Sequence, residues 1–290
     1  MNIEIRNIHQ RFGDTIALND LSLSIEGTKI IGLLGRNGSG KSTLLNIIAG
    51  FRKPTSGKVL MDGEPVFENG RITERLALIR EVGDTVEDSE KVEEALRYAA
   101  YLRPNWNDER ARYLLDRFEV SLKSKISSLS RGRRSALGIA LGLAAQADLT
   151  MLDETYLGLD APSRYLFYDE LLQDYMNQPR TFILSSHLIE EIARFLEDIV
   201  IIDHGKLMFH GNTEQFVSQG AAVTGNAADV DRFVVGKKVI GERQLGRTKS
   251  AMVYGEINIG FLEQASTDGL DVESLGVQDL FVYLTQPKDE

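Results

Sequence analysis

Residues 35–42 of the chain have the sequence and spacing of a loop that binds phosphate groups. The run Gly-Arg-Asn-Gly-Ser-Gly-Lys-Ser fits the pattern GxxxxGK[ST] and lies between an apolar run and a helical pattern. Glycines let successive backbone N–H groups point inward at a phosphate, and the start of the helix adds partial positive charge. Lys41 would reach the β- and γ-phosphates of a nucleoside triphosphate, and the Ser42 hydroxyl would bind Mg²⁺. The loop therefore predicts nucleoside triphosphate binding.

A second group able to do chemistry is the acidic pair Asp153 and Glu154, which ends an apolar run. If this strand ends beside the phosphate loop, Asp153 can hold Mg²⁺, and Glu154 can polarise the attacking water as a general base. Taken alone, two acids after a strand are often only a turn. Downstream of a phosphate loop, and followed by the sequence Gly-Leu-Asp at 158–160, the pair favours hydrolysis.

The elements that must position these groups alternate between strand-like and helix-like patterns. We expect strands over residues 3–5, 21–25, 29–34, 58–61, 149–152, 181–184 and 199–202. We expect helices over residues 42–49, over 90–102 after a cap at Asp88 or Ser89, from Asn107 or Asp108 to Phe118, and from about Ser163. Such alternation predicts an α/β fold with a largely parallel sheet.

The character of the sequence changes after about residue 216. Residues 220–256 are rich in Gly, Ala and Val, with strand-like runs at 232–235 and 251–254, and a helix-like stretch covers 272–284. These patterns predict a small appended α+β domain over 216–290.

Composition limits the classes of function. The chain has 290 residues, and 33 Lys and Arg against 43 Asp and Glu give a net charge of −10, which argues against a general nucleic-acid binder. The absence of cysteine excludes disulfides, thiolate metal sites and cysteine nucleophiles. An apolar content of 42% is ordinary for a globular protein and excludes a disordered or fibrous chain.

No apolar run approaches the ~18–20 residues that a membrane-spanning helix needs, and the N-terminal sequence lacks the features of a signal peptide. We therefore expect a cytoplasmic chain whose connection to a membrane comes through a partner.

Two further motifs complete a family resemblance. Leu129-Ser130-Arg131-Gly132, the start of a signature segment over 129–134, opens a predicted helix, and His187 follows the predicted strand 181–184. The phosphate loop, the LSxG helix start, the acidic strand end, the GLD loop and the histidine, in this order, resemble the ATP-binding subunit of ABC transporters.

The resemblance covers roughly residues 1–215 and implies a P-loop NTPase core of ABC type. Such a core has a mostly parallel sheet, an antiparallel β part and a helical subdomain, here over about 84–146. Residues 216–290 would form the C-terminal extension.

The resemblance also implies a role for each matching residue. The adenine would stack on Phe12, and the phosphates would lie on the loop formed by Gly35, Arg36, Asn37, Gly38, Ser39, Gly40, Lys41, Ser42 and Thr43. Alternatively, Phe12 is a core residue at the end of a strand.

By the same resemblance, Asp153 serves Mg²⁺, Glu154 is the catalytic base, and His187 contacts the γ-phosphate together with Lys41. His187 could instead be an ordinary capping histidine. Ser130 and Gly132 would contact the γ-phosphate bound to the opposite protomer, and Asp160 would lie in the loop that communicates across the dimer. Such a subunit hydrolyses ATP as a head-to-tail dimer, because the signature segment completes the site in trans.

Several residues depart from the family pattern. Arg131 and Arg133 replace a glycine and the glutamine of the usual LSGGQ signature. Because cations oppose the dipole at a helix start unless an anion is present, we expect Arg131, Arg133 or Arg134 to help neutralise the γ-phosphate across the dimer; the alternative is a solvent-facing substitution.

Glu81 stands where the family has a magnesium-sensing glutamine, so we expect it near Mg²⁺. The acids of residues 81–94 would form either a docking face for the membrane subunit or a solvated face.

We therefore expect an ATP-binding and hydrolysing subunit of an ABC transporter, peripheral on the inner face of the cell membrane. Its partners would be a separate transmembrane permease subunit and a second ATPase, in a homodimer or a heterodimer; no nucleic acid is expected. The segment 274–285 is similar to the end of ABC-2-type exporter ATPases, which favours export. The alternatives are a soluble ABC ATPase acting on ribosomes or DNA and a regulatory cassette that binds ATP with little turnover.

Overall fold

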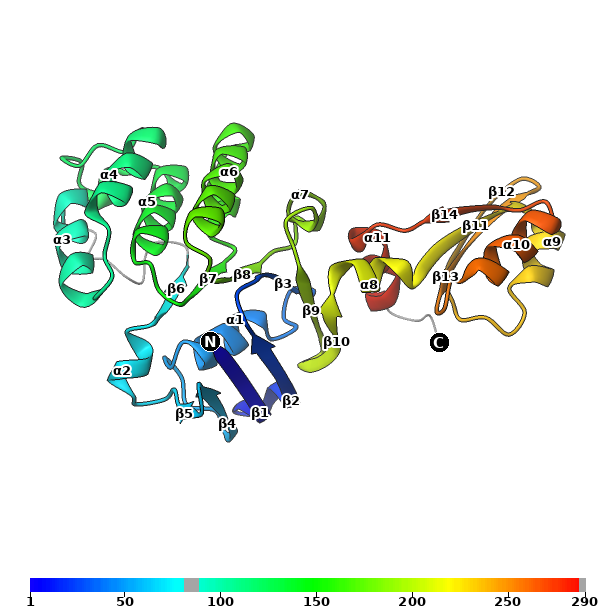
Figure 1. Cartoon of the computed structure of the whole chain (residues 1–290), viewed down its shortest axis with the longest axis horizontal. Coiled ribbons are helices and arrows are strands. Elements are labelled where there is room, and N and C mark those ends of the chain that lie inside the picture. The colour runs from blue at the N-terminus through cyan, green and yellow to red at the C-terminus, as the bar shows by residue number, and fades with distance from the viewer. Residues whose placement is uncertain (81–88, 287–290) are drawn as a thin grey trace. The chain divides into compact units, whose positions relative to one another are not determined.

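The structure is a computed structural model that describes residues 1–80 and 89–286. Glu81 and the acids up to Asp88 lie outside the described residues. The chain divides into two compact units (Figure 1). The first comprises Met1–His187 and Val200–His210, and the second comprises Leu188–Ile199 and Gly211–Glu290.

An antiparallel sheet of four strands, in the order β2-β1-β4-β5, opens the first unit. Its strands are β1 (Asn2–Phe12), β2 (Thr15–Glu26), β4 (Ser56–Met61) and β5 (Glu64–Pro65). Alternating apolar residues give β1 and β2 one buried face, on which Ile3 pairs with Ile25 and Ile5 with Leu23. The predicted strands at 3–5, 21–25 and 58–61 are confirmed, and the first two extend further.

The second sheet has six strands in the order β10-β9-β3-β8-β7-β6. Its strands are β3 (Ile30–Leu34), β6 (Leu76–Ile79), β7 (Leu149–Asp153), β8 (Thr181–Ser185), β9 (Asp198–Asp203) and β10 (Lys206–Asn212). β3 pairs with β8, β8 with β7, and β7 with β6, all in parallel. Every residue of β3 and β8 is buried, as expected for central parallel strands.

Two short helices follow the first strands, α1 (Lys41–Ile48) and α2 (Gly70–Thr73). Leu44 and Ile48 of α1 belong to one hydrophobic cluster with Ile5 of the antiparallel sheet and Ile183 of the parallel sheet. The start of α1 is thereby fixed against both sheets, directly after the phosphate loop.

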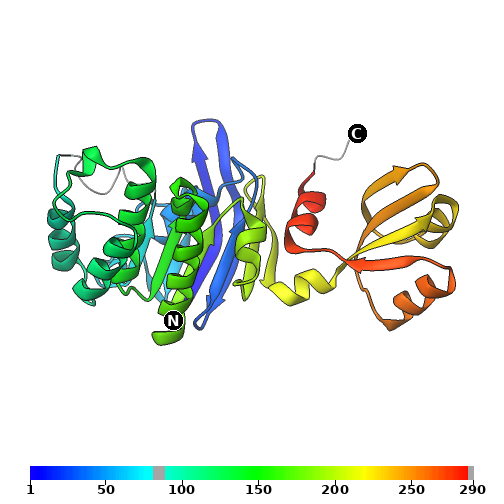
Figure 2. The ribbon, with the colours of Figure 1, turned by 90° about the horizontal axis from the view of Figure 1, so that it is seen from above.

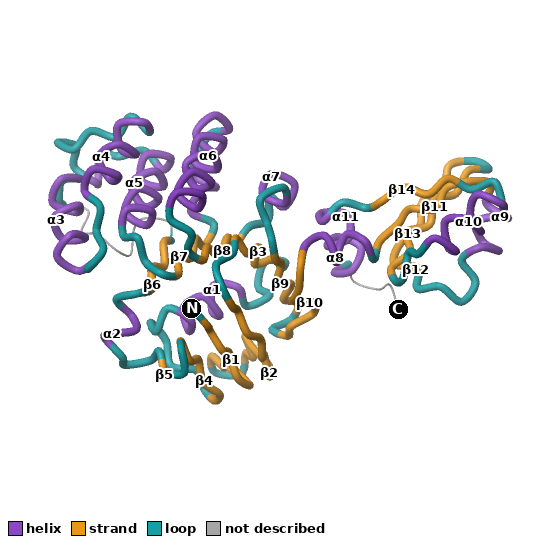
Figure 3. The backbone as a smooth tube through the Cα atoms, viewed as in Figure 1, coloured by secondary structure: helices purple, strands orange, loops and turns teal. Residues whose placement is uncertain are grey.

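Between β6 and β8 the chain is mainly helical (Figure 3). The helices are α3 (Val92–Leu102), α4 (Asp108–Arg117), α5 (Arg131–Ala144) and α6 (Ala161–Asn177), with single 3₁₀ turns η1 (Ile126–Ser128) and η2 (Thr155–Gly158). Asn107 caps α4 as predicted, accepting a hydrogen bond from Arg110 N over 2.9 Å. The prediction that the preceding helix starts at residue 90 is wrong, because Lys91 is its N-cap residue and Lys91 N donates to the Glu94 carboxylate.

The second unit begins with α7 (Ile189–Ala193) and α8 (Thr213–Ser218). It continues with β11 (Gly220–Asn226), α9 (Ala227–Phe233), β12 (Val239–Leu245), β13 (Thr248–Tyr254), α10 (Ile259–Thr267), β14 (Asp271–Ser274) and α11 (Val277–Thr285). The order β12-β13-β11-β14 and the succession βαββαβ define a ferredoxin-like sheet. The sheet is antiparallel throughout its registered pairs.

Both faces of this sheet are in contact with helices (Figure 2). Val223 and Val253 pack with Phe233 of α9 and Phe261 of α10 on one face. On the other face, a Cβ at Gly220 would lie 2.2 Å from the Leu280 side chain, so glycine there lets α11 approach the sheet.

Two sequence predictions for the second unit are wrong. Residues 232–235 do not form a strand, because Phe233 packs edge-on against Phe261, with ring centroids 5.1 Å apart, at the end of α9. The stretch 272–284 is not one helix, because Ser274 pairs with Ala221 in the sheet and α11 starts only after Gly276. The predicted strand at 251–254 is confirmed within β13.

Candidate active site

The phosphate loop joins the end of β3 to the start of α1, as the motif requires. A Cβ at Gly35 would lie 2.5 Å from the carbonyl oxygen of Ile202, and a Cβ at Gly40 would lie 2.6 Å from that of Ala17. Gly40 also has a φ of +108°, a backbone conformation that favours glycine. Close contacts with neighbouring backbone therefore explain why glycine stands at positions 35 and 40 of the loop.

Lys41 is buried, and its ammonium group folds back over the loop. Its Nζ donates to the carbonyl oxygens of Gly35, over 2.8 Å, and Arg36, over 3.3 Å. Burial lowers the pKa of Lys41, while the negative charges of Glu154 and Asp153 act in the opposite direction. The lysine thus lies within electrostatic reach of the acidic pair, where it can exchange loop carbonyls for phosphate oxygens.

The acidic pair lies at the end of β7, the strand beside β8: Asp153 is the last residue of β7, and Glu154 follows it. Asp153 is opposite Ser185 in the parallel register, and its Oδ1 is buried without a hydrogen-bond partner among the described residues. Glu154 has a φ of +54°, and its backbone N donates to the carbonyl oxygen of Ser185 over 3.3 Å. The backbone therefore turns at Glu154, directly after the extended conformation of Asp153 at the end of β7.

His187 lies beside this pair, because β8 and β7 are neighbours with aligned ends. Its Nδ1 is 3.4 Å from Oε1 of Glu154, and both side chains are partly exposed. The parallel sheet therefore brings together the phosphate loop after β3, His187 after β8 and the acids after β7, at the carboxyl ends of adjacent strands.

The residues at this edge fit a bound Mg²⁺. The buried Oδ1 of Asp153 lacks a partner among the described residues, and carboxylate and hydroxyl oxygens are the ligands this ion prefers. Ser42, in the first turn of α1, would supply the hydroxyl. No cluster of three or more acidic or histidine side chains able to hold a metal occurs in residues 1–80 and 89–286. Bound Mg²⁺ usually keeps several waters beside one or two protein ligands and substrate phosphates, and such oxygens would complete this site.

Phe12 ends β1 and is 43% exposed. The guanidinium carbon of Arg52 lies 4.7 Å from the centre of its ring, so one face of the ring already carries a cation–π contact. The sequence around Phe12 does not indicate Arg52, because the contact joins residues far apart in the chain.

Ser130, Gly132 and Asp160 gather around a separate hollow of about 330 Å³. Ser130 caps α5 by accepting from Arg133 N over 3.3 Å, and Asp160 caps α6 by accepting from Ser163 N over 3.0 Å. The pKa of Asp160 is lowered by two hydrogen bonds with Ser163: the larger effect comes from the Ser163 side chain and the smaller from its backbone.

The two helix starts meet closely at this hollow. A Cβ at Gly132 would lie 3.0 Å from the carbonyl oxygen of Gly158. Arg133 also lines the hollow with an exposed side chain, whereas residues of the phosphate loop do not line it. The predicted site residues thus form two groups, one at the sheet edge and one at the starts of α5 and α6.

Two side chains that no sequence motif indicates, Thr155 and Tyr156, support the site. Thr155 Oγ1 donates to the carbonyl oxygen of Ile79 over 2.9 Å, and the Tyr156 hydroxyl donates to that of Ser185 over 3.2 Å. These bonds hold the turn after Glu154 to β6 and β8. Ser185, whose carbonyl oxygen accepts the bond from Tyr156, is the last residue of β8. The strand predicted from the sequence ends one residue earlier, at 184, so extending it by one residue would have included Ser185.

The fold and this edge define a phosphate-loop nucleotide-binding protein of the α/β class. The family described as "ABC transporter" matches residues 18–156, a range that contains the phosphate loop, the signature segment and the acidic pair.

Curated relatives extend the match. The Nod factor export ATP-binding protein I of Cupriavidus pinatubonensis is 30% identical over 220 residues, covering 74% of this chain and 67% of the relative. An uncharacterized ABC transporter ATP-binding protein of Methanocaldococcus jannaschii is 30% identical over 226 residues, with 76% and 81% covered. The ABC transporter ATP-binding protein NatA of Bacillus subtilis is 29% identical over 222 residues, with 73% and 90% covered.

Solved structures show the same fold. An ATP-binding subunit of an ABC transporter aligns with a TM-score of 0.67 at 22% identity, over 74% of this chain and 92% of that one. A dimeric ATP-binding cassette bound to ADP and Pi, in a post-hydrolysis state, aligns with a TM-score of 0.64 at 22% identity, over 73% and 98%.

The chain therefore belongs to the family of ABC transporter ATP-binding proteins and is an ABC-type ATPase. The expected P-loop NTPase fold of ABC type is confirmed.

Proposed function

We propose that the chain is the ATP-hydrolysing subunit of an ABC exporter, and that two ATPase chains close head to tail on ATP to drive a separate membrane subunit. The observation that supports this most directly is the meeting of the phosphate loop, Asp153, Glu154 and His187 at the ends of three neighbouring strands. Residues 1–215 would form the ATPase domain, with a helical subdomain over about 84–146, and 216–290 an accessory domain.

Each residue at the sheet edge has a distinct part in hydrolysis. The loop amides and Lys41 bind the β- and γ-phosphates, and Lys41 gives up its bonds to loop carbonyls to do so. Glu154 takes the proton of the attacking water as general base, and His187, 3.4 Å away, orients that carboxylate and the γ-phosphate. Bound Mg²⁺, held by Ser42 and Asp153, would neutralise phosphate charge.

The second group of residues acts on the nucleotide of the partner chain. Ser130 and Gly132 present backbone and hydroxyl donors at the start of α5, where the helix dipole favours an anion. Arg133 adds a positive charge beside them, and Asp160 connects the hollow to α6. The partner is either a second copy of this chain or a related ATPase.

The membrane subunit would contact another hollow, of about 510 Å³, beside α3 and α5. Phe51, Tyr98 and Leu102 line it with exposed apolar side chains, an arrangement typical of protein interaction sites. Among the described residues, no helix has the length and apolar character to cross a membrane. In this proposal the chain lies at the cytoplasmic face of the membrane, against a cytoplasmic helix of a permease.

Export is the direction that the comparisons favour. The relatives at 30% identity include proteins named for Nod factor export, and the segment 274–285 is similar to the end of exporter ATPases. The exported compound is chosen by the membrane subunit.

The experiment that tests this function is the ATPase rate per chain at rising protein concentration, compared with that of Glu154→Gln. We expect the rate to rise with concentration and to fall by about a thousandfold in the variant, because the general base is lost while ATP binding is kept. Glu68→Gln is the matched control, since Glu68 also has a left-handed backbone, with φ of +59°, on an exposed turn.

Two results would contradict the proposal. Turnover that Glu154→Gln leaves unchanged would remove Glu154 from the chemistry. ATP binding without turnover at any concentration, alone and with the membrane subunit, would instead favour a regulatory cassette.

A further inference from the structure

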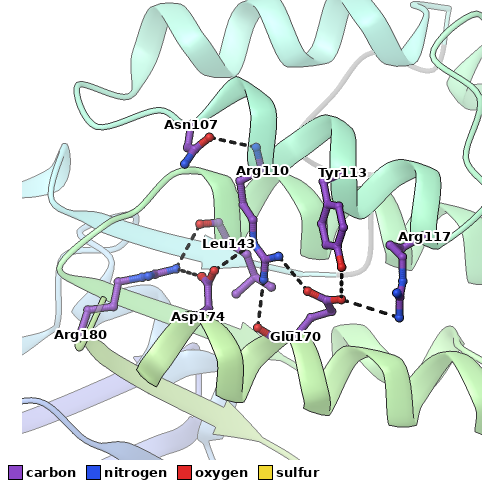
Figure 4. Close-up of polar contacts among 8 residues, drawn as sticks. All are labelled: Asn107, Arg110, Tyr113, Arg117, Leu143, Glu170, Asp174 and Arg180. Carbon is purple, nitrogen blue, oxygen red and sulfur yellow. Dashed lines mark hydrogen bonds and ion pairs between the residues drawn. The ribbon is translucent and has the colours of Figure 1, made fainter. Parts of the chain in front are cut away.

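Four largely buried charged side chains form an ion-pair network in the first unit, beside the C-terminal half of α6 and the C-terminal end of α5 (Figure 4). The network consists of Arg110, Glu170, Asp174 and Arg180, whose side chains are between 2% and 16% exposed. Arg110 contacts Glu170 over 2.7 Å and Asp174 over 2.9 Å, and Arg180 pairs with the other oxygen of Asp174. Two largely buried cations and two largely buried anions therefore face each other, and the half-exposed Arg117 lies 3.9 Å from the other oxygen of Glu170.

The network connects two helices and the start of one strand. Arg110 belongs to α4, Glu170 and Asp174 belong to α6, and Arg180 directly precedes β8. A further bond runs from Arg110 Nη2 to the backbone oxygen of Glu170 over 3.0 Å, so the guanidinium group fixes both the side chain and the backbone of α6.

The same group of residues also holds the end of α5. Arg180 Nη2 donates to the carbonyl oxygen of Leu143 over 3.1 Å, and Asn107 N donates to that of Ala144 over 2.9 Å. Carbonyls in the last turn of a helix lack partners within the helix. Here α5 obtains them from the residue that caps α4 and from the ion-pair network.

The N-terminal ends of α5 and α6 carry the second group of predicted site residues, Ser130, Gly132 and Asp160. α5 starts after Ser130 and α6 after Asp160, and both residues line the 330 Å³ hollow. Glu170 lies ten residues into α6, which is roughly 15 Å along the helix axis from its start. The network is therefore too far away to touch a ligand in the hollow, yet it fixes the two helices that form it.

Stability alone gives a weak reason for such a network. Replacing buried ion pairs by apolar residues of similar volume is often neutral or stabilising, because desolvation offsets the attraction. Directional bonds between buried polar groups fix the relative translation and rotation of packed helices more closely than apolar contacts do. At the hollow, a Cβ on Gly132 of α5 would already lie 3.0 Å from the carbonyl oxygen of Gly158, which ends η2 two residues before Asp160, the N-cap residue of α6. Small shifts of α5 against this lead into α6 therefore change the contact.

We propose that the ion-pair network is a positioning device for the half of the site that serves the partner chain. Arg110 acts through α5 and α6, setting the spacing of the two helix starts so that Ser130 and Gly132 meet the γ-phosphate held by the second protomer. This inference rests on the proposed head-to-tail dimer. The phosphate loop and the Glu154–His187 pair follow strands of the parallel sheet, so ATP binding by the isolated chain is independent of α4.

The test compares ATP binding with ATP-dependent dimerisation in a Glu154→Gln background, which prevents turnover. Arg110→Met and the double variant Arg110→Met/Glu170→Gln are placed in this background. The single variant leaves Glu170 buried without its main cation, whereas the double variant restores charge balance and with it most of the Tm. In both, we expect the dimerisation constant to weaken by about tenfold and the Kd of the isolated chain for labelled ATP to change less than about twofold.

Arg112→Met is the matched control. Arg112 is on the same helix and pairs with Asp108 over 2.6 Å, but both side chains are about half exposed. We expect neither dimerisation nor the Tm to change, because exposed pairs contribute little.

Three outcomes would overturn the inference. Dimerisation that recovers together with the Tm in the double variant would make the network purely structural. Equal weakening of ATP binding by the isolated chain would place its effect on the phosphate loop. If the parent Glu154→Gln chain itself does not dimerise on ATP, the proposed dimer fails, and that result is distinct because it precedes any change at Arg110.

Discussion

Nδ1 of His187 lies 3.4 Å from Oε1 of Glu154, although 33 positions separate the two residues in the chain. The register of the parallel sheet produces this proximity. Asp153 is opposite Ser185, so the residues that follow each strand leave the sheet at the same level. The pair is thus a consequence of strand alignment.

Removing His187 should slow hydrolysis while leaving the fold intact. We expect His187→Ala to lower kcat by about a hundredfold, because the carboxylate of Glu154 loses the group that orients it. The Tm should stay unchanged, since the His187 side chain is 52% exposed. The control is His204→Ala, a histidine 93% exposed beside Asp203. Equal rates for the two variants would exclude His187 from the reaction.

The buried ammonium group of Lys41 should make the stability of the nucleotide-free protein depend on pH. Burial lowers the pKa of Lys41, so in the alkaline range just below 10.5 the unfolded chain binds more protons than the folded one. The free energy of unfolding should therefore rise with pH as this window is crossed. Urea denaturation of wild type and Lys41→Met between neutral pH and that window measures the difference. A parallel pH dependence in both proteins would contradict the prediction.

Alanine at Gly40 should disrupt the phosphate loop far more than alanine at Gly38. Both glycines have positive φ, +108° and +79°, but only at Gly40 would a Cβ meet a backbone atom, the oxygen of Ala17 at 2.6 Å. We expect Gly40→Ala to lower the free energy of unfolding by about 2–3 kcal/mol and Gly38→Ala by about 1 kcal/mol. Denaturant titrations check the order, and equal losses would mean that the backbone contact is readily relieved.

Replacing Arg133 should weaken the use of ATP by the dimer without weakening the fold. We expect Arg133→Gln to raise the KM for ATP by about fivefold to tenfold, because a charge-assisted contact across the dimer is lost. Arg133→Lys keeps the charge and should stay near the wild-type KM. The Tm of both should not fall, since a cation in the first turn of a helix is unfavourable without an anion. An unchanged KM in Arg133→Gln would assign this arginine to solvent.

The sequence was sufficient to predict those parts of the site that are formed by one continuous stretch of the chain. The apolar run before Gly35, the glycines and the helical pattern after Lys41 lie within one continuous stretch, so their order specifies the loop. The acids after β7 and the histidine after β8 could also be assigned to one edge, because each directly follows a buried strand.

Long-range contacts were not predictable in this way. The side chain of Arg110 meets Glu170 from 60 positions away, and nothing near either residue indicates the other. Similarly, the β-like composition of 232–235 gave a strand where tertiary packing of Phe233 on Phe261 favours the end of α9. At these residues the burial of Phe233 on the apolar face of the sheet determines the secondary structure more than local strand propensity does.

The short helix α7 has a consequence for any shortened form of the protein. It lies in the chain between β8 and β9, immediately after His187, yet it belongs to the second unit, where Gln278 Nε2 of α11 donates to Glu190 Oε1 over 2.9 Å. Cutting the chain at residue 215 would thus leave α7 behind without α11, baring apolar surface six residues or fewer from the histidine of the site. The second unit is therefore more than a C-terminal extension, and removing its C-terminal part would first affect the segment that directly follows His187.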